Sequence, residues 1–193
     1  MIVAVVGVVI LIIALAGILY HEKTYAYPEE TEKHTYRIEW NEYSNEITDK
    51  GYVDKNGWKN NYTIDTGEKI ASIANIEFKL SWSDDFDFHG FIFPWNFTDK
   101  IDMSVSIGEL SFSQSGSGYG TISIKATGET PQDMTIEAKN ESEAWKNIGN
   151  VNNKLNCDVT LSIQPRPRFF DKGNDFTLTI IYHYYKPTIS MLS

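Results

Sequence analysis

The sequence predicts a mostly β protein in which a single N-terminal transmembrane helix is followed by an antiparallel β-sandwich with one short helix. Residues 1–20 carry no charged side chain, whereas the rest of the 193-residue chain carries every Asp, Glu, Lys and Arg. Beyond them, short runs of alternating apolar and polar residues are separated by Gly, Pro and Asn-Gly turn signals, which is the pattern of a two-sheet protein. Strand number alone leaves Ig-like and jelly-roll topologies open.

The first predicted element is an anchor helix over residues 1–20, because a helix of this length spans roughly the 30 Å of a bilayer's hydrocarbon core. A cleaved signal peptide is an alternative, with Ala14-Leu15-Ala16 as its cleavage site, but no Lys or Arg precedes the apolar run. Its Val, Ile, Ala and Gly content resembles the N-terminus of processed archaeal pilins and archaellins. The layout of an anchor followed by a sandwich is similar to that of archaellum stator proteins. These resemblances imply a surface filament subunit or an accessory subunit of a membrane complex.

Residues 21–32 are polar, contain Pro28 and are predicted to form a juxtamembrane stalk. The sandwich is expected over 33–193. Lys23, Lys33 and Arg37 alone would favour a cytoplasmic domain. Three glycosylation sequons, at Asn61, Asn96 and Asn140, favour the opposite side. We therefore predict a single-pass membrane protein whose C-terminal domain is extracytoplasmic.

Strands are expected wherever alternation is clear. In the best example, Ile76, Phe78, Leu80 and Trp82 face one way, with Glu77, Lys79 and Ser81 facing the other. Tyr36, Ile38 and Trp40 likewise share one face of an earlier strand. Further strands are predicted over 101–107, 110–113, 119–126, 134–138, 156–163 and 175–185, with a short helix over 141–148.

A cluster of aspartates suggests a Ca²⁺ site, since this cation prefers several oxygen ligands on flexible segments. The candidate ligands are Asp84, Asp85, Asp87, Asp99 and Asp102. The alternative is a solvated loop in which these aspartates cap turns. Ca²⁺ is the only cofactor that the sequence suggests.

An aromatic segment follows, in which Phe91, Phe93, Trp95 and Phe97 share one face of an extended chain. Buried, these side chains are core; exposed, they form an apolar patch for a partner or a sugar ring. Pro94 disfavours a central strand and favours an edge or loop, which adds weight to the exposed, partner-binding alternative without excluding burial.

The net charge of −9 argues against nucleic acid as a partner. The single cysteine, Cys157, lies in an alternating stretch and is expected to be a small buried residue. No nucleophile motif, phosphate loop or zinc spacing is present, so we do not expect an enzyme. The sequence favours a protein that acts by contact with other membrane or surface proteins. The alternatives are self-association in a filament and a carbohydrate- or Ca²⁺-binding module.

Overall fold

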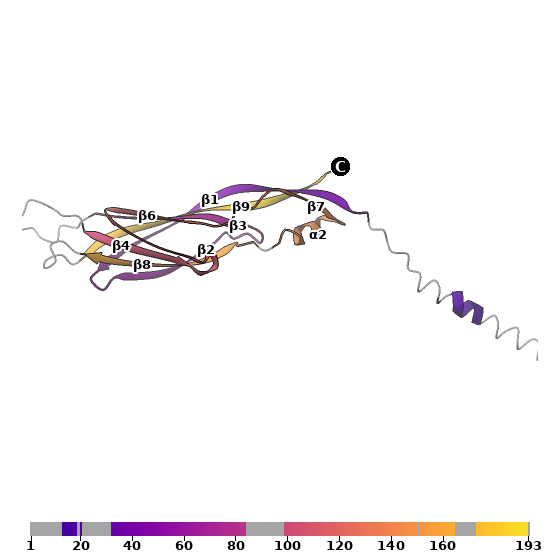
Figure 1. Cartoon of the computed structure of the whole chain (residues 1–193), viewed down its shortest axis with the longest axis horizontal. Helices are drawn as coiled ribbons and strands as arrows, with labels where there is room; N and C mark the ends of the chain where they lie inside the picture. Colours follow the sequence, from indigo (N-terminus) through magenta and orange to yellow (C-terminus); the bar gives the residue numbers. More distant parts are fainter. Residues whose placement is uncertain are drawn as a thin grey trace, which may run out of the picture.

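A computed structural model describes residues 13–18, 20, 32–83, 99–149, 151–164 and 173–192. Most of these residues lie in strands that form two antiparallel sheets packed face to face (Figure 1), which confirms the predicted β-sandwich. The strands are β1 (His34–Asp54), β2 (Trp58–Asp65), β3 (Ser72–Trp82), β4 (Lys100–Ile107), β5 (Phe112–Tyr119), β6 (Thr121–Thr127), β7 (Met134–Ala138), β8 (Lys154–Gln164) and β9 (Gly173–Leu192). The helical elements are the 3₁₀ turn η1 (Gly108–Leu110) and the helix α2 (Glu141–Lys146).

One sheet has the order β6-β3-β9-β1-β7 and the other has the order β2-β8-β4-β5. The chain passes between the sheets at a tight corner where β5 leads through Gly120 into β6. Gly120 has φ +85°, which favours glycine, and a Cβ at Gly118 would collide with the carbonyl oxygen of Thr121. Glycines are therefore needed where the corner brings the two sheets together.

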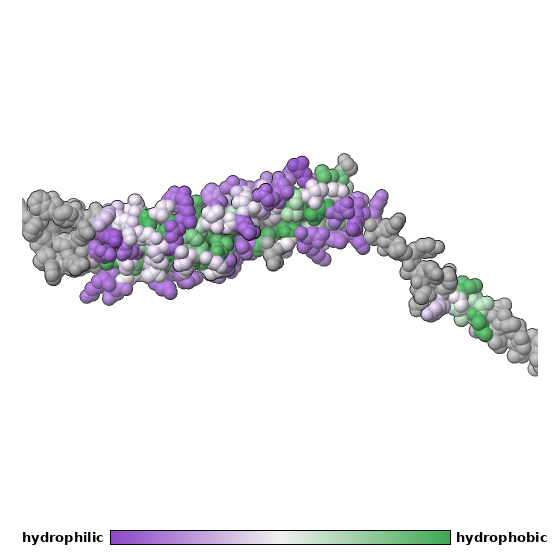
Figure 2. Space-filling view, in the orientation of Figure 1, coloured by the Kyte–Doolittle hydropathy of each residue, from purple (hydrophilic) through white to green (hydrophobic). Residues whose placement is uncertain are grey.

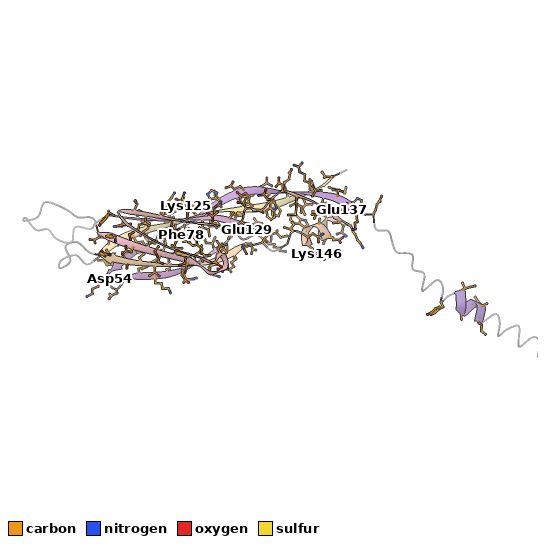
Figure 3. The ribbon with its side chains drawn as sticks, in the orientation of Figure 1. Asp54, Phe78, Lys125, Glu129, Glu137 and Lys146 are labelled. Atoms are coloured by element: carbon orange, nitrogen blue, oxygen red, sulfur yellow. The ribbon has the colours of Figure 1, made fainter. Side chains whose placement is uncertain are left out.

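The main core lies between the inner faces of the sheets. In the first sheet, Phe78 pairs with Ile180 and Leu80 with Leu178, and all four side chains are at most 1% exposed. Figure 3 shows Phe78 between the two layers. Cys157 of β8 is also fully buried in this core, as the sequence predicted, and burial raises the pKa of its thiol to about 12.

The longest feature is a ribbon of β1 and β9, which pair over twenty positions without a shift in register. Near the sandwich, odd-numbered β1 residues such as Ile47 and Val53 face the core, whereas Tyr36 and Ile38 are the buried residues at the far end. Because side chains alternate strictly along a strand, the buried face changes side along the ribbon. The strong right-handed twist of two-stranded ribbons produces such a rotation without a bulge.

The far end of the ribbon forms a small second core, which we call the distal lobe. It consists of residues 34–41 of β1, residues 186–192 of β9, β7 and α2, and α2 lies beneath the strands in Figure 1. Tyr36, Ala138 and Ala144 are buried there, with Ile136 and Ile189 packed against them. Asn140 caps α2, because its side-chain oxygen accepts a hydrogen bond from the Glu143 N–H at 3.0 Å.

The N-terminal part of the predicted fold class is wrong. Among the residues that the structure describes, no helix combines the length and the apolar character needed to cross a membrane. Within 1–20, the structure describes residues 13–18 and 20. Residues 1–12 lie outside the described part. The predicted transmembrane helix, its role as a signal-anchor and the single-pass membrane location with an extracytoplasmic domain are corrected accordingly.

Candidate functional site

Beyond Tyr185, strand β9 pairs on one side only among the residues that the structure describes. Its pairing with β3 ends where Ser72 lies opposite Tyr185, whereas its pairing with β1 continues to Leu192. Within the described residues, Lys186–Leu192 therefore pair along one edge only, and we call their other edge the open edge; Pro187, at its start, is buried. It lies in line with the position that β3 occupies farther along the sheet.

Hydrogen bonds on β1 show which backbone groups the open edge presents. The N–H groups of Trp40, Glu46 and Lys50 donate to side chains instead of to β9, so even-numbered β1 residues point away from that strand. In an antiparallel ladder, the β9 residues paired with these β1 residues direct their own N–H and C=O groups away from β1, on the opposite side of the ribbon. The register pairs these residues with odd-numbered β9 residues. The amides of Ile189 and Met191 therefore face outwards from the open edge.

Pro187 occupies a third outward-facing position, and it has no N–H to offer. Its place is consistent with the confinement of proline to edge strands, because no ladder hydrogen bond is lost there. None of the turn and side-chain hydrogen bonds recorded within the described residues uses the backbone of 186–192. The open edge thus presents two amide donors and the carbonyl groups of its outward-facing residues.

By contrast, side chains cover much of the edge of β1 that faces away from β9. The Trp40 amide donates to Asp133 Oδ1 at 2.9 Å, and those of Glu46 and Lys50 donate to the preceding Asn45 and Asp49. Asp49 also accepts a 2.6 Å hydrogen bond from the hydroxyl of Tyr62 on β2, which ties the two sheets together along this side. Such caps are a known way to block edge-to-edge pairing.

A groove of about 540 Å³ lies at the start of the open edge. Its lining includes the three consecutive β9 residues Lys186, Pro187 and Thr188, whose side chains alternate between the two faces of the strand. A hollow that touches both faces must run along the edge of the strand. The other walls are Trp145 of α2 and the β2–β3 loop, residues 67–70.

The loop wall is held in place by a set of short hydrogen bonds. The side chain of Asn153 donates to the carbonyl of Glu68 at 2.7 Å, and the Gly67 amide donates to Asp65 Oδ1 at 2.8 Å. The hydrogen bond from the Gly67 amide is also the main reason why the pKa of Asp65 is lowered. The groove is therefore formed before any partner arrives.

Three charged residues line the groove, and two of them, Lys186 and Glu68, form an ion pair, while Lys69 adds a second positive charge. Lys186 Nζ lies 3.1 Å from Glu68 Oε1 and 4.3 Å from the centre of the Tyr43 ring. The hydrogen bond to Glu68 is the main cause that raises the pKa of Lys186, so this lysine stays protonated at neutral pH. Tyr43 in turn stacks on Tyr184, with ring centres 5.8 Å apart. The site offers aromatic surface without a strong net charge.

Apolar rows cross the distal lobe and reach its edges. Met191, Tyr36 and Ile136 lie side by side on neighbouring strands, and so do Ile189, Ile38 and Met134. The central residues are buried, whereas Met191 at the open edge is 59% exposed. Figure 2 shows apolar surface at this end of the ribbon, where β9 ends. An exposed methionine at the end of an apolar row marks the place where a further strand would continue it.

Two of the five sequence-predicted cation ligands, Asp99 and Asp102, lie within the described residues. Asp99 is fully buried, and its carboxylate accepts a hydrogen bond from the side-chain amide group of Asn174 at 3.2 Å. Asp102 lies on the outer face of β4, where the Ser117 hydroxyl and the Gln164 side chain donate to it. The Ser117 hydrogen bond is the main cause that lowers the pKa of Asp102. Within the described residues, no group of three or more acidic, His or Cys side chains could hold a metal ion.

The other predicted site residues are only partly described. Asp84, Asp85 and Asp87 lie outside the described residues, as do the aromatic side chains Phe91, Phe93, Trp95 and Phe97 and the sequon at Asn96. Asn61 and Asn140 are both exposed. The Asn61 amide group donates to Asp158 Oδ1 at 3.2 Å. Glycosylation at these two positions stays a prediction.

Sequence reasoning missed the open edge. The predicted last strand stopped at Tyr185, in front of Pro187, although the strand continues to Leu192. The signal was present in Thr188-Ile189-Ser190-Met191, which alternates polar and apolar residues as a strand does. Alternation does not reveal that the pairing of β9 with β3 stops at Tyr185, so that β9 extends beyond its neighbour.

Comparison with known proteins adds no functional assignment. No family model matches the chain, and no curated protein matches it. Among solved structures, the chain is similar to one from desmodium yellow mottle tymovirus, with 9% identity over 81% of this chain and 86% of that chain. The TM-score of this similarity is 0.28, and no inference is based on it.

Proposed function

We propose that this protein is a β-sandwich binding protein that acts by protein–protein contact, and that the distal lobe makes the contact. The observation that carries this proposal is the open edge of β9, with Met191 59% exposed beside a preformed groove. Exposed methionines are common at binding surfaces because their flexible side chains adapt to a partner. The sandwich then serves as the rigid support from which the ribbon extends.

The electrostatics of the groove agree with a protein partner. Among the described residues, the Lys186–Glu68 ion pair leaves Lys69 as the unpaired charge in the groove lining, and the exposed apolar side chains Met191 and Leu192 follow on β9. Interface centres in proteins are typically depleted in charge and enriched in aromatic residues and methionine. Of the two lysines that line the groove, Lys186 is paired with Glu68, whose carboxylate would repel an anionic ligand.

Photo-crosslinking in the cells that produce the protein tests this proposal. A photoreactive amino acid replaces Met191 in one variant and Lys125 in a matched control. Lys125 is on the outer face of β6 (Figure 3), and its side chain is 70% exposed. We expect one adduct of defined mass with the first variant and none with the control. The absence of an adduct at position 191, or the same adducts at both positions, would refute the proposal.

A further inference from the structure

We infer that the turn between β1 and β2 is a modification site, at which Asn56 deamidates spontaneously, and that Asp54 holds the rate of this reaction below that of the unfolded chain. Asn56 is exposed, and Asn56-Gly57 is the only Asn-Gly pair in the sequence. The turn lies at the opposite end of the molecule from the distal lobe, as the positions of Asp54 and Glu137 in Figure 3 show. The inference is therefore independent of the proposed function.

The reaction needs only the chain itself and water. The backbone nitrogen of Gly57 loses its proton and attacks the side-chain carbonyl carbon of Asn56. A carbon–nitrogen bond forms, the bond from that carbon to Nδ2 breaks, and ammonia leaves with a proton. Water then opens the resulting cyclic imide at either carbonyl, which leaves aspartate or isoaspartate at position 56. Glycine favours the first step because it has no side chain that shields the attacking nitrogen.

The fold requires glycine at the attacking position. Gly57 has φ +77°, and a Cβ there would lie 2.8 Å from the backbone carbonyl oxygen of Leu161. This close approach comes from the sheet itself, because the next residue, Trp58, begins β2 opposite Leu161 of β8. A larger, shielding residue is therefore excluded at position 57, and protection of Asn56 has to come from its other neighbours.

Asp54 supplies this protection through its side chain and its backbone. Its Oδ1 accepts a hydrogen bond from the Asn56 N–H at 2.8 Å, and its Oδ2 accepts one from the Asn56 side chain at 3.0 Å. Its carbonyl oxygen accepts a hydrogen bond from the Gly57 N–H at 2.9 Å. The Asn56 side chain is thus directed back towards Asp54 instead of onto the nitrogen that follows it. The negative charge of Asp54 also opposes the loss of the Gly57 proton.

The products of the reaction would fit this turn less well than asparagine does. An aspartate at position 56 has no Nδ2 to donate, and its carboxylate would lie beside that of Asp54. An isoaspartate also lengthens the backbone within the turn that the Gly57–Asp54 hydrogen bond closes. The turn therefore needs asparagine at this position, and the carboxylate that binds it also delays its loss.

The test follows deamidation of the full-length protein at mildly alkaline pH by mass spectrometry of its proteolytic peptides. It compares the native protein with the same chain unfolded in guanidinium chloride and with native Asp54→Ala. Asp65→Ala is the matched control, because Asp65 also accepts a hydrogen bond from the amide two residues on, but at the other end of β2. Asn56 should react at least about tenfold faster in the unfolded chain and in Asp54→Ala than in the native protein, because hydrogen bonds that restrain it are lost. Asp65→Ala should change its rate less than about twofold, because no hydrogen bond of Asn56 is lost there.

A second variant guards against misfolding of Asp54→Ala. Asp54→Asn removes the charge but keeps a side-chain oxygen that can accept one of the two hydrogen bonds, so its rate should lie between those of the native protein and Asp54→Ala. Equal rates at Asn56 in the native and unfolded chains would overturn the inference, and so would an unchanged rate in Asp54→Ala. Equal acceleration in Asp65→Ala would show that general loosening of the fold is the cause. Faster deamidation at another asparagine of the native protein would refute the assignment of the site.

Discussion

The distal lobe and the main core should unfold separately. A comparison of Ile38→Ala with its matched control Ile180→Ala tests this. Both isoleucines are fully buried, but Ile38 lies in the distal lobe and Ile180 in the main core. The change to alanine removes three carbon atoms, which is worth about 2.4 kcal/mol at about 0.8 kcal/mol per methylene, and a residual cavity adds to this. We therefore expect each substitution to cost about 3 kcal/mol in its own core.

Amide hydrogen exchange followed residue by residue is the suitable assay. In Ile38→Ala, exchange should become about a hundredfold faster in β7, α2 and the distal ends of β1 and β9, while β4 and β8 keep their wild-type rates. In Ile180→Ala, the amides of β4 and β8 should also exchange faster, because the global free energy of unfolding falls. Equal acceleration throughout the chain in Ile38→Ala would refute the reasoning, since it would mean that the lobe and the sandwich are one cooperative unit.

Three further predictions concern single contacts. Gly51→Ala should lower the free energy of unfolding by about 1–3 kcal/mol in urea titrations, because the added Cβ would lie 2.7 Å from the ring of Phe176. In the control Gly108→Ala the added Cβ has no atom within 4 Å, so the loss should be much smaller. Equal losses in the two variants would contradict this prediction. Cys157 should resist thiol reagents at pH 8 in the folded protein and react after unfolding, because its pKa is raised from 9.0 to about 12. The same shift should make the free energy of unfolding fall as the pH rises from 9 to about 12. Rapid labelling of the native protein would contradict this prediction. Ser117→Ala should raise the pKa of Asp102 in an NMR titration, because the hydrogen bond from Ser117 is the main cause that lowers it. Asp102 stabilises the fold above its unfolded pKa, and this contribution is lost on acidification, so it should be smaller in the variant. An unchanged pKa of Asp102 would show that Ser117 is not the cause.

Alternation in the sequence was sufficient to find the strands that are buried on one face. The predicted inward set of Ile76, Phe78, Leu80 and Trp82 is buried as expected, and the predicted strand over 134–138 has the observed bounds of β7. Tyr36 and Ile38 are also buried on the predicted shared face. In each case one face packs against apolar side chains, so the sequence carries the pattern that the packing demands.

The sequence underestimated strands whose hydrogen bonds come from distant partners. Residues 41–54 are mostly polar, because they lie on an edge of the sheet, so none of the strands predicted from alternation covers them. The strand β1 nevertheless continues through them on the ladder with β9. Gly116 and Gly118 fall between the predicted strands 110–113 and 119–126 but belong to β5. They are needed there because a Cβ at Gly116 would lie 3.2 Å from Ile122 across the corner. Propensity alone does not contain this tertiary constraint.

The candidate site depends on a difference in length between two strands, and no local pattern encodes such a difference. β3 begins at Ser72 because the preceding segment, held by Asn153, leads from β2 of the other sheet, while β9 continues beside β1. A free edge of this kind is usually an aggregation hazard, and proteins limit it by keeping it short, twisted or interrupted by proline. Pro187 does this here, since it leaves only two outward amides. An edge restricted in this way is too short to propagate a sheet.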